Sequence, residues 1–409
     1  MPTKTLVVAG GGAAGFFCAV NAARLSPGLR VVILEKSGKL LSKVKVSGGG
    51  RCNVTHQCHS ITEMIKCYPR GASFLKKSFH HFFTSDVIEW FKSRGVKLKA
   101  EPDGRMFPVS NSSQTIIDCL LAESEKYAVE LRMHTALKSI KKAAGRWVLH
   151  TTGETLIADA VCIAAGGFPK PDQFSWLLET GHTISMPVPS LFTFNLADKA
   201  ITGLMGIAVE NVQVKIAGTK LVENGSLLIT HWGFSGHAIL RLSAWGARLL
   251  AEKEYAFEVL VNWCPPYNET SVIPLLLNMQ DIHSSRKVIN KNEFGLPARL
   301  WEHLIIESGI DEDCKWGNLS AKLRNRLART LCSSVFRVNG KATFKEEFVT
   351  AGGISLGEID ANSMESKLAP GLYFAGEIMD VDGITGGYNF QHAWTSGYLA
   401  AQSISKKHL

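Results

Sequence analysis

The chain has 409 residues, of which 45% are apolar and 20% are charged, and its formal net charge is +9. This composition supplies enough apolar side chains for a folded core and excludes a mainly disordered chain. No stretch approaches the roughly 18 uninterrupted apolar residues of a membrane span, which excludes a membrane-spanning protein. Nine cysteines without a Cys-x-x-Cys pair favour reduced thiols, so we expect a cytoplasmic protein of two or three domains.

The first forty residues predict a strand–helix–strand unit. The apolar run Thr5–Ala9 predicts a buried strand, and apolar residues at helical spacing from Ala14 to Leu25 predict a helix. A second, β-branched strand is expected over Arg30–Glu35. Strand and helix are joined by a glycine-rich turn, which is the arrangement of a dinucleotide-binding motif.

The turn has the pattern Gly10-x-Gly12-x-x-Gly15, and each glycine has a physical role. Gly10 permits the tight turn, Gly12 lets the backbone approach a pyrophosphate, and Gly15 allows the helix to pack closely. The helix N-terminus adds unpaired N–H groups for the phosphates. Glu35 can accept hydrogen bonds from the adenosine ribose. We therefore expect a bound dinucleotide; the alternative is an accidental glycine-rich turn.

Further along the chain the pattern predicts a mixture of helices, extended segments and turns. Asn224-Gly225 predicts a tight hairpin in an antiparallel β domain, and Asp103-Gly104 predicts another hairpin. Helices are expected around 74–83, 86–94 and 113–127, within 272–332, and to about residue 405, with extended chain over 129–164 and a buried strand over 372–375.

The C-terminal segment Gly371–Asn389 favours FAD as the dinucleotide. A predicted strand there ends on acidic and glycine residues that can meet a ribityl chain, and a helix begins at a glycine pair. The positive end of that helix can stabilise the reduced flavin. No second glycine fingerprint is present, so we expect one firmly held dinucleotide. An ordinary strand–turn–helix is the alternative interpretation.

Longer motifs resemble the BaiN/RdsA-like (YhiN-like) family of bacterial NAD(P)/FAD-dependent flavoproteins, whose members include a bile-acid reductase and a ribosomal RNA dihydrouridine synthase. The matching segments are 10–15, 35–36, 43–55 (with SGGGRCNVT), 104–110, 230–236, 349–353 and 371–389. The resemblance implies an α/β fold, in which a glutathione-reductase-like, Rossmann-type FAD-binding domain carries an inserted antiparallel β-barrel domain and a small helical subdomain.

We assign residues 1–190 and 341–409 to the FAD domain, 191–270 and 333–340 to the β domain, and 271–332 to the helical subdomain. The resemblance also implies FAD as cofactor, NAD(P)H as a transient electron donor, and reduction of an activated C=C bond. The sequence departs from the family at Phe168–Trp176, where most members have a run rich in Gly, Ser, Thr and Asp. Members also often have Pro where His237 stands.

The loop from Lys36 to Asn53 combines cations with small polar residues beside the expected cofactor. Lys43, Lys45 and Arg51 can hold a phosphate, and Asn53 can contact the flavin ring; a solvated basic loop is the alternative. The predicted cofactor-binding residues are Gly10, Gly12, Ala13, Ala14, Gly15, Glu35, Lys36, Lys43, Ser47, Gly48, Arg51, Cys52, Asn53, Ala165, Gly166, Gly376, Glu377, Asp380, Gly386, Gly387, Tyr388 and Asn389.

Two residues are candidates for catalysis. His231 precedes a glycine-rich turn and can donate a proton or stabilise an oxyanion, although a structural histidine explains it equally well. Cys52 is a second candidate acid, with a buried thiol packed near the ring as the other interpretation. Cys52, His56, Cys58 and His59 match no standard zinc spacing, so we expect no metal.

A cationic helix is predicted over residues 320–329. Its Lys322, Arg324, Arg326 and Arg329, without an acid among them, can contact RNA phosphates, or can form an exposed face that aids solubility. The favoured substrate is a uridine in ribosomal RNA. The alternatives are a small enone such as a steroid or bile-acid intermediate, a flavin oxidase of small molecules, and an RNA-binding assembly factor that holds FAD structurally. No oligomeric state is predicted.

Overall fold

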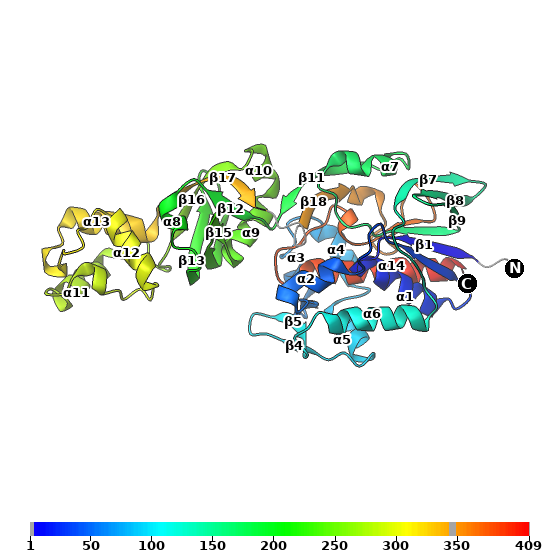
Figure 1. The fold of residues 1–409 in the computed structure, drawn as a ribbon, viewed down its shortest axis with the longest axis horizontal. Coiled ribbons are helices and arrows are strands. Elements are labelled where there is room, and N and C mark those ends of the chain that lie inside the picture. The colour runs from blue at the N-terminus through cyan, green and yellow to red at the C-terminus, as the bar shows by residue number, and fades with distance from the viewer. Residues whose placement is uncertain (1–3, 343–348, 409) are drawn as a thin grey trace. The chain divides into compact units, whose positions relative to one another are not determined.

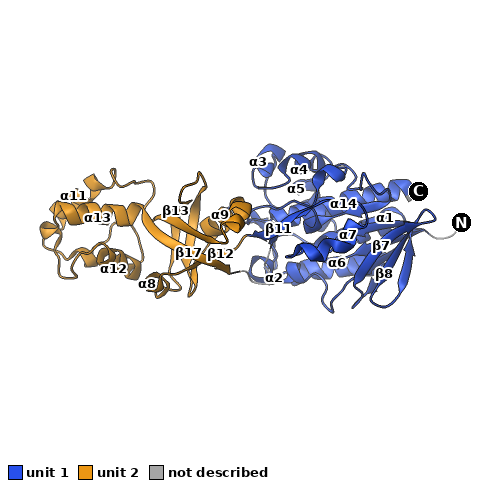
Figure 2. Ribbon diagram, turned by 90° about the horizontal axis from the view of Figure 1, so that it is seen from above, with its two compact units in different colours: residues 1–190, 344–409 blue, residues 191–343 orange. Residues whose placement is uncertain are grey.

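The computed structural model describes residues 4–342 and 349–408, and the chain forms two compact units (Figure 2). The first unit comprises residues 1–190 and 344–409, and the second comprises residues 191–343. The first unit is thus assembled from two separate stretches of chain. The predicted domain ranges include residues 1–3, 343–348 and 409, which lie outside the described residues. The division into three domains stays a prediction.

A five-stranded sheet, parallel throughout, forms the centre of the first unit (Figure 1). Its strand order is β19 (Leu372–Phe374), β10 (Ala160–Ile163), β1 (Thr5–Ala9), β2 (Arg30–Leu34) and β6 (Glu130–Arg132). All of β1 and β10 is buried, as their apolar runs predict. The order places a strand from near residue 373 in the same sheet as the first strand of the chain.

Two helices from opposite ends of the chain, α1 (Ala13–Leu25) and α14 (Tyr388–His408), pack along each other. Gly397 allows the close approach, because a Cβ there would lie 2.6 Å from the carbonyl oxygen of Ala14. Phe17 packs on Trp394 with ring centroids 5.2 Å apart. This packing joins the glycine-rich turn to the C-terminal segment.

Three smaller antiparallel sheets complete the first unit: β3 (Thr55–His56), β5 (Arg105–Pro108) and β4 (Leu98–Ala100); β7 (Leu137–Ala143), β8 (Arg146–Thr151) and β9 (Thr155–Ala158); and β11 (Ile184–Ser190) with β18 (Val349–Ile354). Its other helices are α2 (Ser42–Gly50), α3 (Ile61–Ile65), α4 (Ala72–Phe79), α5 (Thr84–Lys92), α6 (Gln114–Lys126), η1 (Pro171–Phe174), α7 (Ser175–Leu178), η4 (Leu356–Glu358) and η5 (Gly376–Ile378).

The second unit contains a closed six-stranded antiparallel barrel. Around the barrel the strands are β12 (Thr193–Leu196), β15 (Gly233–Ser235), β14 (Val222–Ile229), β13 (Ala208–Ile216), β16 (Ala256–Asn262) and β17 (Ser334–Ala342). Its helices are α8 (Lys199–Thr202), α9 (His237–Trp245), α10 (Ala247–Glu252), α11 (Ile273–Ile282), η2 (Val288–Asn290), α12 (Ala298–Glu307), η3 (Trp316–Asn318) and α13 (Ala321–Cys332). Barrel residues such as Val214 and helical residues such as Leu304 share one buried core.

The predicted α/β class, with a Rossmann-type domain and an antiparallel β-barrel, is confirmed. The hairpin predicted at Asn224-Gly225 is wrong, because both residues lie inside β14 and pair with β13. The chain turns at residues 217–220 instead, where the Ile216 N–H bonds to the Leu221 carbonyl at 3.1 Å. The pairing of β13 with β14 has a register shift, or bulge, directly before the pair formed by Val212 and Gly225. Gly225 has a φ of 152°, so glycine is favoured here by the bulge and not by a tight turn.

Candidate functional site

The glycine motif forms the turn between β1 and α1, at the carboxyl end of the parallel sheet. A Cβ on Gly10 would lie 2.2 Å from the Ala164 carbonyl oxygen, and a Cβ on Gly15 would lie 1.9 Å from the Gly10 carbonyl oxygen. Gly12, the N-cap of α1, has open space on its Cβ side and no side-chain cap. The first N–H groups of α1 therefore keep donors for an anionic ligand.

Glu35 follows β2 and is held against this turn. Its Oε2 accepts from the Gly11 N–H at 2.9 Å, and its Oε1 accepts from the N–H and the hydroxyl of Ser37, both at 2.8 Å. A carboxylate offers about four acceptor positions, so roughly one stays available for a ligand hydroxyl. The carboxylate is thereby oriented before any ligand arrives.

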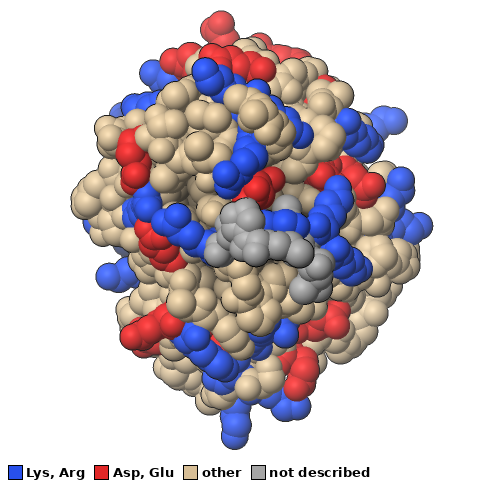
Figure 3. All heavy atoms as spheres, turned by 90° about the vertical axis from the view of Figure 1, so that its right-hand side faces the viewer, with Lys and Arg blue, Asp and Glu red and all other residues tan. Residues whose placement is uncertain are grey.

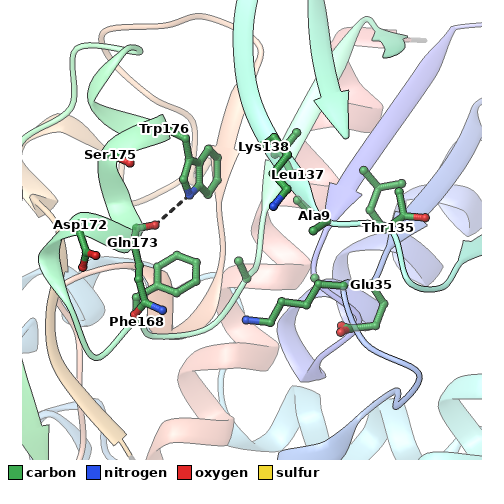
Figure 4. A pocket seen from close by; sticks show the side chains of 15 residues that line it. Ala9, Glu35, Thr135, Leu137, Lys138, Phe168, Asp172, Gln173, Ser175 and Trp176 are labelled. Carbon is green, nitrogen blue, oxygen red and sulfur yellow. Dashed lines mark hydrogen bonds between the residues drawn. The ribbon is translucent and has the colours of Figure 1, made fainter. Parts of the chain in front are cut away.

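A pocket of about 340 Å³ lies beside the turn and Glu35 (Figure 4). Strand ends of the sheet supply one part of its lining, and the segment 168–176 supplies another. Ala165, predicted to bind the cofactor, lines the pocket, and Gly166 follows it with a φ of 76°. The lining residues are Ala9, Gly10, Leu34, Glu35, Lys36, Thr135, Ala136, Leu137, Lys138, Ala165, Phe168, Asp172, Gln173, Ser175 and Trp176.

Two of the three cations predicted to hold a phosphate, Lys43 and Arg51, are paired with carboxylates, and the third, Lys45, is exposed. The Lys43 ammonium lies 2.5 Å from Glu377 Oε2, which ties α2 to the residues that follow β19. Arg51 lies 2.5 Å from Glu101 and stacks its guanidinium 4.0 Å from the centre of the Phe107 ring. These pairs fix the loop in place, and any contact with a phosphate would share the cation with a carboxylate.

Cys52 lies at a strained and fully buried position. Its φ is +62°, and it follows three glycines, residues 48–50, which all have positive φ. Burial raises the pKa of the Cys52 thiol to about 12, and a hydrogen bond with Ser47 opposes this only partly. A thiol with such a pKa stays protonated and is a weak proton donor at neutral pH. This geometry favours the interpretation of Cys52 as a packed thiol.

Two predicted amide side chains hold the glycine-rich start of α14. In the amide orientation that satisfies both partners, Asn53 accepts from the Gly387 N–H at 2.9 Å and donates to the Thr55 carbonyl at 3.0 Å. Asn389 accepts from the Gly383 N–H at 2.8 Å and donates to its carbonyl at 2.9 Å. A Cβ on Gly387 would lie 2.5 Å from the Thr55 carbonyl oxygen, so the backbones meet closely here.

The remaining predicted residues of this segment also belong to the same region of the first unit. Tyr388 is buried and stacks on the His56 ring at 4.8 Å, and its carbonyl accepts from the Tyr68 hydroxyl at 2.7 Å. The N–H of Asp380 bonds to the Ile354 carbonyl at 3.1 Å. The structure therefore gathers residues from 10–53 and 376–389 around one sheet edge; that they bind a cofactor stays a prediction.

Two buried polar groups were not among the predicted site residues. The carboxylate of Asp382 is fully buried, forms an ion pair with Arg70 and accepts from the Ser190 hydroxyl at 2.7 Å. Burial raises the pKa of Asp382, and the Arg70 partner opposes this rise. His392 in α14 is also buried, and its Nε2 contacts the Gly376 carbonyl at 3.2 Å. Asp382 is one of the acidic residues of segment 371–389 that were expected to meet a ribityl chain, but its carboxylate is already held by Arg70 and Ser190. The helical spacing of α14 gave no indication of His392.

The second unit carries the other candidate residues. His231 is exposed on the turn between β14 and β15, with its ring 3.9 Å from that of Trp232. In α13, Lys322, Arg326 and Arg329 are exposed and share one helix face. The inclusion of Arg324 in that face is wrong, because its side chain is half-buried and donates to Gln280 of α11 at 2.7 Å.

The described residues contain no cluster of three or more His, Cys, Asp or Glu side chains suited to a metal ion. Within residues 4–342 and 349–408, no helix has the length and apolar character to cross a bilayer. All nine cysteines are free thiols.

Comparison with known proteins identifies the family. The domain described as "HI0933-like protein Rossmann domain" matches residues 4–403. The chain belongs to the HI0933-like Rossmann family.

Relatives of this HI0933-like protein match nearly all of its length. It is 30% identical over 407 residues to the ribosomal RNA dihydrouridine synthase of Escherichia coli (strain K12), covering 97% of each chain. It is 27% identical over 410 residues to the 3-dehydro-bile acid delta(4,6)-reductase of Clostridium scindens, covering 98% of each. The family match and these relatives confirm the predicted family and the prediction that the protein is an oxidoreductase.

A solved structure shares the fold of the HI0933-like protein. It is the 3-ketosteroid delta1-dehydrogenase from Sterolibacterium denitrificans, with a TM-score of 0.52 and 14% identity, and the match covers 99% of this chain and all of that one. At this identity the likeness concerns the fold alone.

Proposed function

We propose that this HI0933-like protein is an FAD-dependent reductase that uses NAD(P)H to reduce an activated C=C bond, and that its substrate is a uridine in ribosomal RNA. The observation that carries the proposal is the open space beside the backbone of Gly12. It lies between the uncapped N-terminus of α1 and the oriented carboxylate of Glu35. The named relative at 30% identity supplies the substrate class.

The residues present fit FAD. Backbone N–H groups at the start of α1 would bind the pyrophosphate, and the free acceptor position of Glu35 would bind a ribose hydroxyl. The closely packed backbone at Gly387, where α14 begins, would border the flavin ring. FAD, when bound, supplies the hydride-transfer chemistry that side chains lack. NAD(P)H is assigned as a transient donor because the sequence has only one glycine fingerprint.

A uridine suits this chemistry because its C5=C6 bond is conjugated with a carbonyl group. Chemistry on a base requires that the base leave its stack, so free ribosomal RNA or an assembly intermediate is the proposed form of the substrate. An RNA substrate also makes the cytoplasm the proposed location, in keeping with nine free thiols.

The charge of the chain supports a polyanionic partner. On the face of the first unit drawn in Figure 3, Lys and Arg side chains alternate with Asp and Glu rather than forming one continuous basic patch. We assign RNA phosphate contacts to the exposed cationic face of α13, formed by Lys322, Arg326 and Arg329, which has no acidic residue within the helix. Such contacts make binding weaken as the salt concentration rises.

The test uses ribosomal RNA from a strain in which the gene is deleted. The purified protein is incubated with this RNA and with NADH or NADPH under anaerobic conditions, and dihydrouridine is mapped by mass spectrometry. We expect dihydrouridine at a defined position in the treated RNA and at the same position in RNA from the parent strain. Identical maps for the parent and deletion strains would refute the RNA substrate.

A second candidate function is reduction of a small conjugated enone, because one full-length relative is named as a bile-acid reductase. The same reaction mixture with a steroid 4-en-3-one in place of RNA tests it. Oxidation of NAD(P)H that depends on the enone, together with unchanged RNA, would favour this candidate over the first.

The RNA contact on α13 has its own test. In the variant K322Q/R326Q/R329Q, the slope of log affinity against log salt should fall by about 0.7 for each lost contact with single-stranded RNA. A control variant loses the same charge at exposed positions elsewhere in the second unit: Lys199, Lys220 and Arg337. Equal slopes for the two variants would remove α13 from the interface.

A further inference from the structure

The pocket beside Glu35 has an aromatic side that the glycine motif does not explain. Figure 4 shows Trp176 and Phe168 on one side of this pocket, and Glu35 and Thr135 on the other. Both rings come from the segment Phe168–Trp176, which continues from β10 through η1 into α7. Both are half-buried, so each keeps some ring surface exposed.

Internal contacts hold these two rings in place. The Trp176 Nε1 donates to the Gln173 carbonyl at 3.0 Å, so the polar atom of the indole is satisfied within its own segment. Phe168 packs edge-to-face on buried Phe174, with centroids 4.9 Å apart and an interplanar angle of 89°. The helix α7 packs against β7, which supplies Leu137 to the pocket. The rings of Trp176 and Phe168 therefore present apolar surface to a ligand, and their positions are fixed by these contacts.

We propose that Trp176 and Phe168 form a wall on which the adenine base of FAD stacks. The inference rests on the proposed FAD binding and adds the residues that select this cofactor. A flat base gains from stacking on an aromatic side chain without needing specific hydrogen bonds. The pocket adjoins Glu35 and Gly10, so a base placed there lies next to the groups assigned to the ribose and the pyrophosphate.

This wall makes the site selective for the dinucleotide form of flavin. FMN carries the same isoalloxazine ring as FAD but lacks the adenosine, so it cannot use the wall. Lys36 reinforces the wall, since its ammonium lies 5.6 Å from the centre of the Phe168 ring, where it interacts with the π-electrons.

The test compares the binding of FAD and FMN to protein freed of flavin. For Trp176→Ala we expect the Kd for FAD to rise about 10- to 100-fold, the range set by one base stacked on one aromatic ring. Phe168→Ala should act in the same direction, Trp176→Phe should restore most of the affinity, and the Kd for FMN should not change. The matched control is Leu178→Ala, because Leu178 lies in the same helix but is 54% exposed and does not line the pocket.

The outcomes separate this inference from the proposed function. If the unchanged protein binds no FAD, both fail. If it binds FAD and the Trp176 and Phe168 variants keep a Kd within twofold of the parent, only the aromatic wall is refuted. An equal loss of FAD and FMN affinity would also refute it, because the substitution would then act through the fold.

Discussion

The buried imidazole of His392 should make the protein sensitive to acid. Only 2% of His392 is exposed, and its Nε2–H donates to the Gly376 carbonyl at 3.2 Å, while Nδ1 has no partner among the described residues. Burial lowers the pKa of His392 from 6.5 to about 4, and the bond to Gly376 only partly offsets this. The folded protein therefore holds the neutral ring.

The sign and the size of the effect follow from this lowered pKa. The pKa of His392 is lower in the folded chain than in the unfolded chain. Below pH 6.5 the unfolded chain therefore binds a proton on this ring, whereas the folded chain leaves the ring neutral until the pH approaches 4. The stabilisation is complete above pH 6.5 and is lost as the pH falls towards 4. A difference of 2.5 pH units at 1.36 kcal/mol per unit amounts to about 3 kcal/mol.

The assay is urea unfolding of the parent protein and of His392→Gln at several pH values between 7.5 and 4.5. Glutamine keeps an N–H donor for the Gly376 carbonyl but does not titrate in this range. The parent should lose about 2.5 kcal/mol more than the variant over this range, because pH 4.5 still lies above the folded pKa of about 4. His80→Gln, at an exposed position, should behave as the parent does. Equal losses in the parent and in His392→Gln would show that His392 is not the source of the acid sensitivity.

Two further predictions concern the glycine turn and the buried ion pair. Gly15→Ala should abolish flavin retention, because the added Cβ would lie 1.9 Å from the Gly10 carbonyl oxygen, and the ratio of flavin to protein absorbance measures the loss. The control Gly28→Ala, which has open space around the added Cβ, should retain its flavin. Flavin retained by Gly15→Ala would contradict this prediction. Arg70→Met should lower the free energy of unfolding by about 3–5 kcal/mol, because it removes the ion-pair partner of the buried Asp382 carboxylate. Adding Asp382→Leu to the same chain should restore much of this loss. A loss below about 1 kcal/mol in Arg70→Met alone would contradict the prediction.

The sequence predicted the parts of the fold that depend on neighbouring residues. The buried strand Thr5–Ala9, the helix after it and the position of Glu35 follow from short-range patterns, and the structure has all three. The residue pattern predicted an antiparallel β domain, and only the resemblance to a family implied that it closes into a barrel; the six strands were not predicted. Within it, Asn224-Gly225 misled the hairpin prediction because the glycine lies beside a bulge rather than in a turn.

Contacts between distant residues were out of reach of the sequence. Arg70 and Asp382 are 312 positions apart, and no periodicity links them. Helical spacing alone would have separated Arg324 from the exposed face of α13, since Lys322, Arg326 and Arg329 follow the spacing of one face and Arg324 does not. Counting the four cations of this helix together hid the fact that Arg324 lies on a different face from the other three.

Whether this protein holds FAD can be measured on the protein as it is purified. The protein is purified without added flavin and denatured, and the released small molecules are identified by mass spectrometry and compared with the protein in amount. We expect FAD in an amount close to that of the chain. A colourless protein that releases no flavin, and that takes up none from excess FAD, would contradict this expectation.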